Sequence, residues 1–269
     1  MPDETRVAPI DVSSSVDQRR RFKIPGPVIS VTVLLAVGIL WWTVTSGLEL
    51  VRELFFPSPE ALLASLTTLN IRLLEDALAT LARVLVSWIG GSALGVLVGL
   101  LMARSRTLMY ALNPLIEALR PVPPVALIPF VILWFGIGAS GKLFLGALGC
   151  FMVMVVNTTV AVTNVPPVLL QAARSLGAND GVLYRRVVFP SILPEILSGF
   201  RIGSALAFAV IVAAEFLGAD AGIGRLIMAA SRTLNTPVVL LGTIVIAIMA
   251  VLVDQAILRI SAYLTRWSP

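Results

Sequence analysis

The sequence predicts an all-α integral membrane protein with six transmembrane helices, and three observations support this fold class. Hydrophobic residues make up 58% of the 269 residues and charged residues only 13%, about half the charged share of soluble proteins. The apolar residues form unbroken runs of about 20 residues, enough for a helix to cross the ~30 Å hydrocarbon core. Apolar and polar residues do not alternate within these runs, so helices are favoured over a membrane β-barrel.

The apolar runs place the spans in order. The first run follows the basic segment from Arg19 to Lys23 and has no small-residue cleavage site, so we expect a retained span rather than a signal peptide. Residues 1–24 are then expected to form a disordered cytoplasmic tail, and residues 25–269 a transmembrane domain. The six spans are predicted at residues 28–47, 81–102, 112–135, 143–162, 194–217 and 237–260.

Two regions between or within the spans have features of their own. Residues 48–81 form the longest loop between spans, in which Ser58 and Pro59 are expected to begin a short surface helix through Leu69. The third span contains prolines at positions 114, 121, 123, 124 and 129. Each proline lacks an N–H and frees a carbonyl group, so we expect kinks in this span where a cavity is lined.

The distribution of positive charge predicts the topology. Six spans place both termini on the same side of the membrane. Twelve Lys and Arg residues fall on that side, in the two tails, the second loop and residues 166–190, against five on the other side. Because cytoplasmic loops carry the excess of positive charge, both termini and residues 166–190 are predicted to be cytoplasmic.

The residue types that are missing exclude several classes of chemistry. The chain has no histidine, and its one cysteine, Cys150, lies in an apolar run where it is expected to be a buried hydrophobe. Glu117 and Arg120 are spaced to pair on one helix face, which favours a structural ion pair. No paired carboxylates, metal-ligand cluster or nucleophile with its base is found, so the sequence predicts no enzyme and no metal site. The net charge of +5 forms no aromatic-interleaved patch for nucleic acid.

Two glycine motifs have structural interpretations. Gly91, Gly95 and Gly99 form a small-residue stripe for close helix packing, either within the chain or between subunits. The stretch 136–142 fits the first seven positions of a phosphate-binding loop, but it lacks the hydroxyl residue at the eighth and the preceding strand. We therefore expect an outer turn with a snorkelling lysine there, and no ATPase within this chain.

Four polar residues inside the spans are candidates for a transport pathway or gate. Asn157 and Thr158 form a polar step in the fourth span, Ser204 lies in the fifth, and Glu215 stands near its outer end. Ionisable residues in membrane spans are costly and are often functional. Hydrogen bonding between helices is the alternative for the three neutral residues, and an interfacial carboxylate is the alternative for Glu215.

Residues 166–190, called the knob below, form a polar and basic segment between apolar runs. A proline pair at its start suits a helix N-terminus. Gly177 is placed where a glycine would end this helix, and Asn179 offers an N-cap for a second short helix that Pro190 would stop. Two short helices joined by a glycine turn make a compact knob, which predicts a docking point for a partner in the water phase.

The knob resembles the EAA loop of ABC-importer permeases, whose pattern is Glu-Ala-Ala, three residues, Gly, nine residues and Ile-x-Leu-Pro. Here Gln171 replaces the glutamate and Val187 and Phe189 replace Ile and Leu, but the spacing to Gly177 and Pro190 is kept. The stretches RPVPPVALIPFVILWFGIG and LPEILSGFRIGSALAFAVIVAAEFLGADAGIG look like the nitrate/sulfonate/taurine branch of that family. The resemblance covers roughly residues 50–265.

This resemblance implies a type I importer permease fold in the bacterial inner membrane, with the knob as a coupling-helix loop. It implies a second permease copy in a homodimer, two cytoplasmic ABC ATPases that bind ATP and Mg²⁺, and an extracytoplasmic substrate-binding protein; this chain binds no cofactor. The residues expected to couple to the ATPase are Gln171, Ala172, Ala173, Gly177, Arg185 and Pro190.

The same resemblance implies that the substrate is a small organic anion. A sulfonate such as taurine is the first expectation, with nitrate, bicarbonate and aromatic carboxylates as alternatives within the family. The alternative function is an ion-coupled secondary transporter, for which Glu215 and Asp254 are the deep acidic residues. That alternative leaves the predicted cytoplasmic knob without a role.

Overall fold

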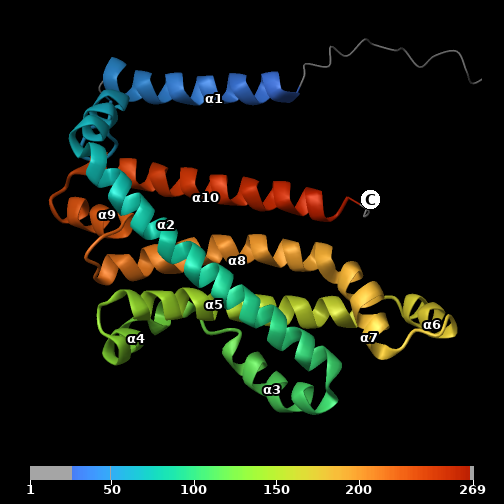
Figure 1. Cartoon of the computed structure of the whole chain (residues 1–269). Coiled ribbons are helices and arrows are strands. Elements are labelled where there is room, and N and C mark those ends of the chain that lie inside the picture. Colours follow the sequence, from blue (N-terminus) through green and yellow to red (C-terminus); the bar gives the residue numbers. More distant parts are fainter. Residues whose placement is uncertain (1–25, 49, 267–269) are drawn as a thin grey trace, which may run out of the picture.

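The computed structural model of the protein describes residues 26–48 and 50–266. The tail predicted at residues 1–24 lies outside the described residues. Within the described ranges all regular elements are helical, and α2 runs diagonally across α8 and α5 (Figure 1). The helices are α1 (Gly26–Trp42), α2 (Pro59–Arg104), α3 (Arg106–Leu119), α4 (Ile128–Phe135), α5 (Ala139–Thr163), α6 (Pro167–Ser175), α7 (Asp180–Leu183), α8 (Phe189–Leu217), α9 (Ile223–Arg232) and α10 (Thr236–Leu264).

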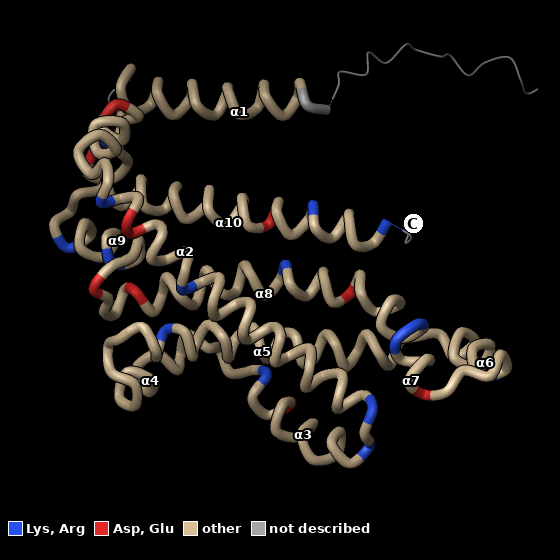
Figure 2. Tube along the Cα trace, in the orientation of Figure 1, with Lys and Arg blue, Asp and Glu red and all other residues tan. Residues whose placement is uncertain are grey.

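Most predicted spans have a long helix of their own. Five helical segments among the described residues are long and apolar enough to cross a membrane, and the bent pair α3–α4 makes six if it is counted as one span. The first span is α1 with a π-helical turn at Thr43–Gly47, and the fourth to sixth spans lie within α5, α8 and α10. Charged residues gather toward the helix ends, and few lie along the middle of the long helices (Figure 2).

Helix α2 begins at Pro59, within the expected loop, and is broken once, at Asn70. Its continuous part after this break starts about ten residues before the predicted second span. Ser58 caps the predicted surface helix by accepting a hydrogen bond from the Ala61 N–H at 3.2 Å. Asn70 breaks the helix with φ 37° and ψ −115°, and the helix then resumes at once. Asp76 falls in the segment that was predicted as a loop between spans, but it is buried and paired with Arg225 within the fold.

The third span is broken rather than merely kinked. The α3 helix ends at Leu119, a 3₁₀ turn covers Pro124–Leu127, and the two helical parts are bent by 83°. A residue before proline is disfavoured in the helical region, so the prolines at 121, 123 and 124 prevent a continuous helix. The break leaves backbone groups without their helical hydrogen bonds, and these groups need partners in a water-filled cavity or in neighbouring protein.

The core lies where α2, α5, α8, α9 and α10 meet. Val84, Ile211 and Ile223 are fully buried there, on α2, α8 and α9. The amphipathic helix α9 was not predicted, and it packs against α10 at Gly242, where a Cβ would lie 2.6 Å from Ile227 Cγ1. By contrast, the described side chains of α1 up to Leu40 are all exposed in the single chain.

The glycine stripe packs α2 against α5 within the chain. A Cβ at Gly95 would lie 2.6 Å from Met154 Cβ, and one at Gly99 would lie 2.8 Å from Thr158 Cβ. Small residues allow such a close approach of two helix backbones, where dispersion replaces the hydrophobic effect as the attractive force. Of the two interpretations of this stripe, the structure supports packing within the subunit.

Candidate functional site

The knob begins with α6, which ends in a complete Schellman motif. The Ala178 N–H donates to the Ala173 carbonyl at 3.0 Å, and the Gly177 N–H donates to the Arg174 carbonyl at 2.9 Å. Gly177 has φ +82°, in the left-handed region that favours glycine. The last carbonyl groups of α6 are thereby satisfied, so the turn that joins the two knob helices has a defined shape.

The second knob helix begins at the predicted N-cap but does not stop at Pro190. The Asn179 Oδ1 accepts a hydrogen bond from the Val182 N–H at 2.9 Å, and α7 passes through a π-helical segment, Tyr184–Val188, directly into α8. The prediction that Pro190 ends this helix is wrong, because Pro190 falls in the first turn of α8, where a missing N–H is tolerated. Residues 180–217 therefore form one helical segment of 38 residues.

The knob is anchored to the ends of α2 and α5. The Arg104 guanidinium lies over the Tyr184 ring at 5.1 Å from its centroid, a cation–π contact between α2 and the knob. Val165 and Val188 are buried in a small core with Ile192. The knob is thus a packed extension of three helices rather than a loose loop.

The outer surface of the knob combines exposed apolar and polar residues. Leu176, next to the glycine turn, is 89% exposed, and Val168 is 71% exposed. Exposed apolar groups with a polar surround on a compact element are typical of a protein interaction site. Of the six residues expected to couple, Gln171, Ala172, Gly177 and Arg185 are exposed, whereas Ala173 and Pro190 are half-buried.

The four polar candidates in the spans do not form one site. Thr158 is fully buried against α2, and its hydroxyl has no hydrogen-bond partner among the described residues. Ser204 is buried and donates to the carbonyl of Arg201 in its own helix at 2.8 Å. Asn157 lines a cavity of about 500 Å³ between the bent span, α5 and α8. Glu215 lies at the other end of α8 from the knob.

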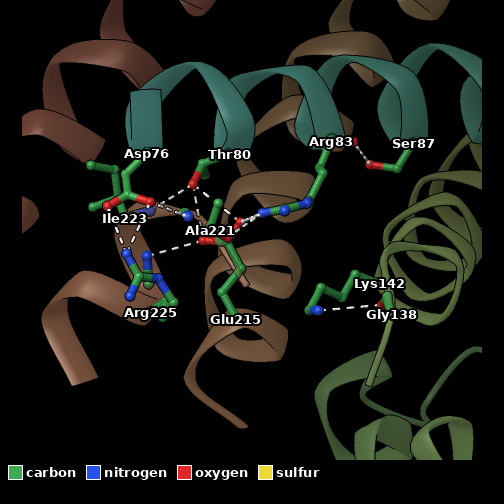
Figure 3. A network of polar contacts seen from close by, with 12 residues as sticks. Asp76, Thr80, Arg83, Ser87, Gly138, Lys142, Glu215, Ala221, Ile223 and Arg225 are labelled. Carbon is green, nitrogen blue, oxygen red and sulfur yellow. Dashed lines mark hydrogen bonds and ion pairs between the residues drawn. The ribbon is translucent and has the colours of Figure 1, made fainter. Parts of the chain in front are cut away.

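Glu215 is the centre of a buried polar network that joins α2, α8 and the start of α9 (Figure 3). Its carboxylate accepts from Arg83 Nη1 at 2.6 Å, from the Thr80 hydroxyl at 2.9 Å, and from the Gly224 N–H at 3.0 Å. The same Thr80 hydroxyl accepts from the Ile223 N–H at 2.9 Å. Both carboxylate oxygens are therefore bound by groups of the chain itself.

Two further sets of polar contacts lie near this network (Figure 3). Asp76 accepts from the Gly222 N–H at 2.6 Å and pairs with Arg225 at 3.2 Å. Lys142 is buried and donates to the carbonyl groups of Ile137 and Gly138 at 2.6 and 3.2 Å. The prediction of a snorkelling lysine is wrong, because these two carbonyls draw its ammonium group inward.

A further ion pair joins α8 and α10 near the middle of both helices. Arg201 donates to both oxygens of Asp254, at 2.8 and 3.0 Å, in a bidentate pair. The sequence pointed to Asp254 as an acidic residue for ion coupling. In the structure its charge is neutralised by an arginine of the same chain, which is the geometry of a strong charge-assisted pair.

Comparison with known proteins decides the family. Residues 91–267 match the family described as binding-protein-dependent transport system inner membrane component. The chain belongs to this family. It is 36% identical over 261 residues to the taurine transport system permease protein TauC of Escherichia coli (strain K12), over 92% of this chain and 94% of TauC. It is 35% identical over 238 residues to the SsuC permease of that strain, named for aliphatic sulfonates, over 87% of this chain and 90% of SsuC.

A solved structure shares the fold of this permease. A chain of the methionine ABC transporter MetNI, in an inward-facing conformation, superposes with a TM-score of 0.60 at 22% identity, over 74% of this chain and 98% of that chain. The predicted all-α membrane fold of the type I importer permeases is thereby confirmed. The protein is a multi-pass permease subunit of an ABC importer in the inner membrane, a transport component rather than an enzyme.

Proposed function

We propose that this permease imports a small sulfonate, such as taurine, and is driven by ATP hydrolysis on a separate cytoplasmic ATPase. The relation to two permeases named for taurine and aliphatic sulfonates supports this choice of substrate over nitrate, bicarbonate or an aromatic carboxylate. ATP and Mg²⁺ are proposed to bind the ATPase only. The remaining partners are a second copy of this chain, a second ATPase and an extracytoplasmic binding protein.

The single observation that carries the mechanism is the continuity of the knob with α8. Closure of the two ATPases on ATP would displace the knobs as rigid bodies, since the Schellman turn and the core beneath the knob resist deformation. Because residues 180–217 are one helical segment, a displacement of the knob tilts the fifth span directly. The spans would then exchange an inward-open for an outward-open arrangement, and the binding protein would deliver its ligand.

The exposed residues of the knob are proposed to lie in a cleft of the ATPase. Leu176 and Val168 supply apolar contacts, and Arg185 supplies a positive charge at the rim. Gln171 has no charge where the family pattern has glutamate, so it would contact the ATPase through hydrogen bonds alone. This arrangement requires the knob and both termini to be cytoplasmic, as the distribution of Lys and Arg predicts.

Reconstitution tests the proposal. The tagged chain is expressed with the ATPase and binding-protein genes that neighbour it, purified, and placed in proteoliposomes with labelled taurine on the binding-protein side. We expect a stoichiometric ATPase to co-purify and uptake to require ATP rather than ADP. A chain that purifies alone and transports on an ion gradient would instead establish a secondary transporter. Uptake of nitrate but not taurine, with ATP dependence kept, would retain the importer and reject the sulfonate.

A further inference from the structure

The cavity of about 500 Å³ lies where the third span is broken, and its walls are almost entirely apolar. The bent span, the middle of α5 and Leu206 of α8 form these walls. Only two lining residues, Arg120 and Asn157, have polar side chains, and the other ten have none. None of the described residues that line the cavity is acidic, so among them the only formal charge is the positive charge of Arg120.

Arg120 directly follows α3, at the break between the two halves of the bent span. Its side chain is exposed, and it takes part in no ion pair among the described residues. Glu117, the partner that its spacing suggested, makes no ion pair with it within the described ranges. An ionisable residue inside the spans that lacks a counter-ion is a candidate for binding a charged ligand.

Asn157 faces the same cavity from α5, and α8 determines where its amide group lies. A Cβ at Gly199 of α8 would lie 2.5 Å from Asn157 Nδ2. The amide therefore lies against α8 at a glycine, and a larger side chain at 199 would have to displace it. An amide supplies both a donor and an acceptor, so it can bind an anion oxygen or a neighbouring amino group.

We infer that Arg120 binds the anionic head group of the substrate as it passes through this cavity, with Asn157 as a second polar contact. This inference rests on the proposed function. The planar guanidinium matches two oxygens of a sulfonate or carboxylate at once, which a lysine does not. A transport pathway must bind its substrate strongly enough for entry and weakly enough for release. A single arginine among apolar walls meets this requirement, because it attracts an anion without surrounding it with polar groups.

The test replaces the charge and then restores it chemically. Cys150 is fully buried, and Cys150→Ala gives a background without thiols into which Arg120→Cys is introduced. Loss of a hydrogen bond to a charged group weakens binding about 10- to 100-fold. We therefore expect taurine uptake at low substrate concentration to fall at least about tenfold. Aminoethyl methanethiosulfonate, which adds a positive charge, should restore uptake, whereas methyl methanethiosulfonate, which is neutral, should not.

Two controls separate ligand binding from folding and coupling. Arg106→Cys in the same background removes an exposed charge from the other end of α3 and should not show this difference between reagents. ATP hydrolysis stimulated by the loaded binding protein should persist in the Arg120→Cys variant, because the knob is untouched. Arg120→Lys should retain more uptake than Arg120→Gln.

The possible outcomes distinguish this inference from the proposed function. If the wild-type assembly takes up taurine and the Arg120→Cys variant takes it up equally well, the inference is wrong and the importer function stands. Equal effects of the cationic and neutral reagents overturn it as well, because they show that size rather than charge matters. Absence of ATP-dependent sulfonate uptake by the wild-type assembly rejects the proposed function, and the inference then fails with it.

Discussion

Replacing Glu215 by glutamine should destabilise the protein far more than its conservative shape suggests. The carboxylate receives hydrogen bonds from Arg83, Thr80 and the Gly224 N–H, and each of these groups faces it as a donor. The Thr80 hydroxyl accepts from the Ile223 N–H and donates its own hydrogen to Glu215. A glutamine would turn an NH₂ group toward one of these donors and would leave Arg83 without a counter-ion.

The size of the effect follows from burial. Glu215 is 1% exposed, and the side chain of Arg83 is 16% exposed. Breaking a buried ion pair by removing one partner costs about 3–5 kcal/mol. In a chain of this size 1 kcal/mol corresponds to about 2–4 °C in Tm, so Glu215→Gln should lower Tm by roughly 10 °C.

The assay is thermal unfolding in detergent, followed by size-exclusion chromatography of the fraction that remains folded. Asp220→Asn is the matched control, because Asp220 is an exposed acid five residues further along. It should change Tm by less than about 2 °C, as surface substitutions do. A double-mutant cycle with Arg83→Gln should give a coupling energy of about 2–3 kcal/mol.

Two results would contradict this reasoning. A change in Tm below about 2 °C for Glu215→Gln would mean that the fold does not require a negatively charged acceptor at this position. Additive effects of the Glu215 and Arg83 substitutions would mean that the two residues act independently, despite the 2.6 Å separation of their charged atoms.

Three further predictions concern the knob, the packing of α2 against α5 and the start of α2. Gly177→Ala should strain the left-handed turn by about 1–2 kcal/mol and lower the uptake per ATP hydrolysed, whereas Gly177→Asn should lower it less; equal coupling in both variants and wild type would refute this. Gly95→Ala should cost about 1–3 kcal/mol in thermal unfolding, unlike Gly90→Ala, since a Cβ at Gly90 meets nothing within 4 Å. Glu60, at the start of α2, accepts hydrogen bonds from the Ser46 hydroxyl and from Trp42 Nε1, both at 2.7 Å. These bonds, first that from Ser46, lower the pKa of Glu60 below its ordinary 4.5, so the contact with Ser46 and Trp42 should persist above pH 4.5 and be lost only as pH falls through the lowered pKa. The fluorescence of Trp42, which donates to the Glu60 carboxylate, reports this loss. A fluorescence transition above pH 4.5 would contradict the prediction.

Local sequence determined the helical elements and the shape of the knob. The long apolar runs lack the alternation of a β-barrel, so helices were the remaining way for a backbone in hydrocarbon to satisfy its own hydrogen bonds. The glycine at 177 and the asparagine at 179 act within a few residues of themselves, and the structure gives them the expected φ angle and cap. Pro190 was misjudged because its effect depends on the π-helical turn before it, which has no simple sequence pattern.

The partners of buried charges depended on contacts distant in sequence. Asp76 and Arg225 are 149 residues apart and lie in segments that were predicted as loops between spans. Glu215 was predicted as a gate candidate or an interfacial carboxylate, and the donors that surround it come from two other elements, α2 and α9. A charged residue whose partner lies more than a hundred residues away looks solvated in the sequence.

By itself, therefore, the sequence determined the fold class and the local caps, because helix periodicity, proline and glycine act over a few residues. The family was expected from the resemblance of the knob to the EAA loop, not from periodicity. Only the tertiary structure decided which polar residues face a cavity and which are bound within the protein. Asn157 and Thr158 are adjacent in sequence, yet one lines the cavity and the other is buried against α2. Successive residues of a helix point about 100° apart, so the packing of neighbouring helices assigns them different surroundings.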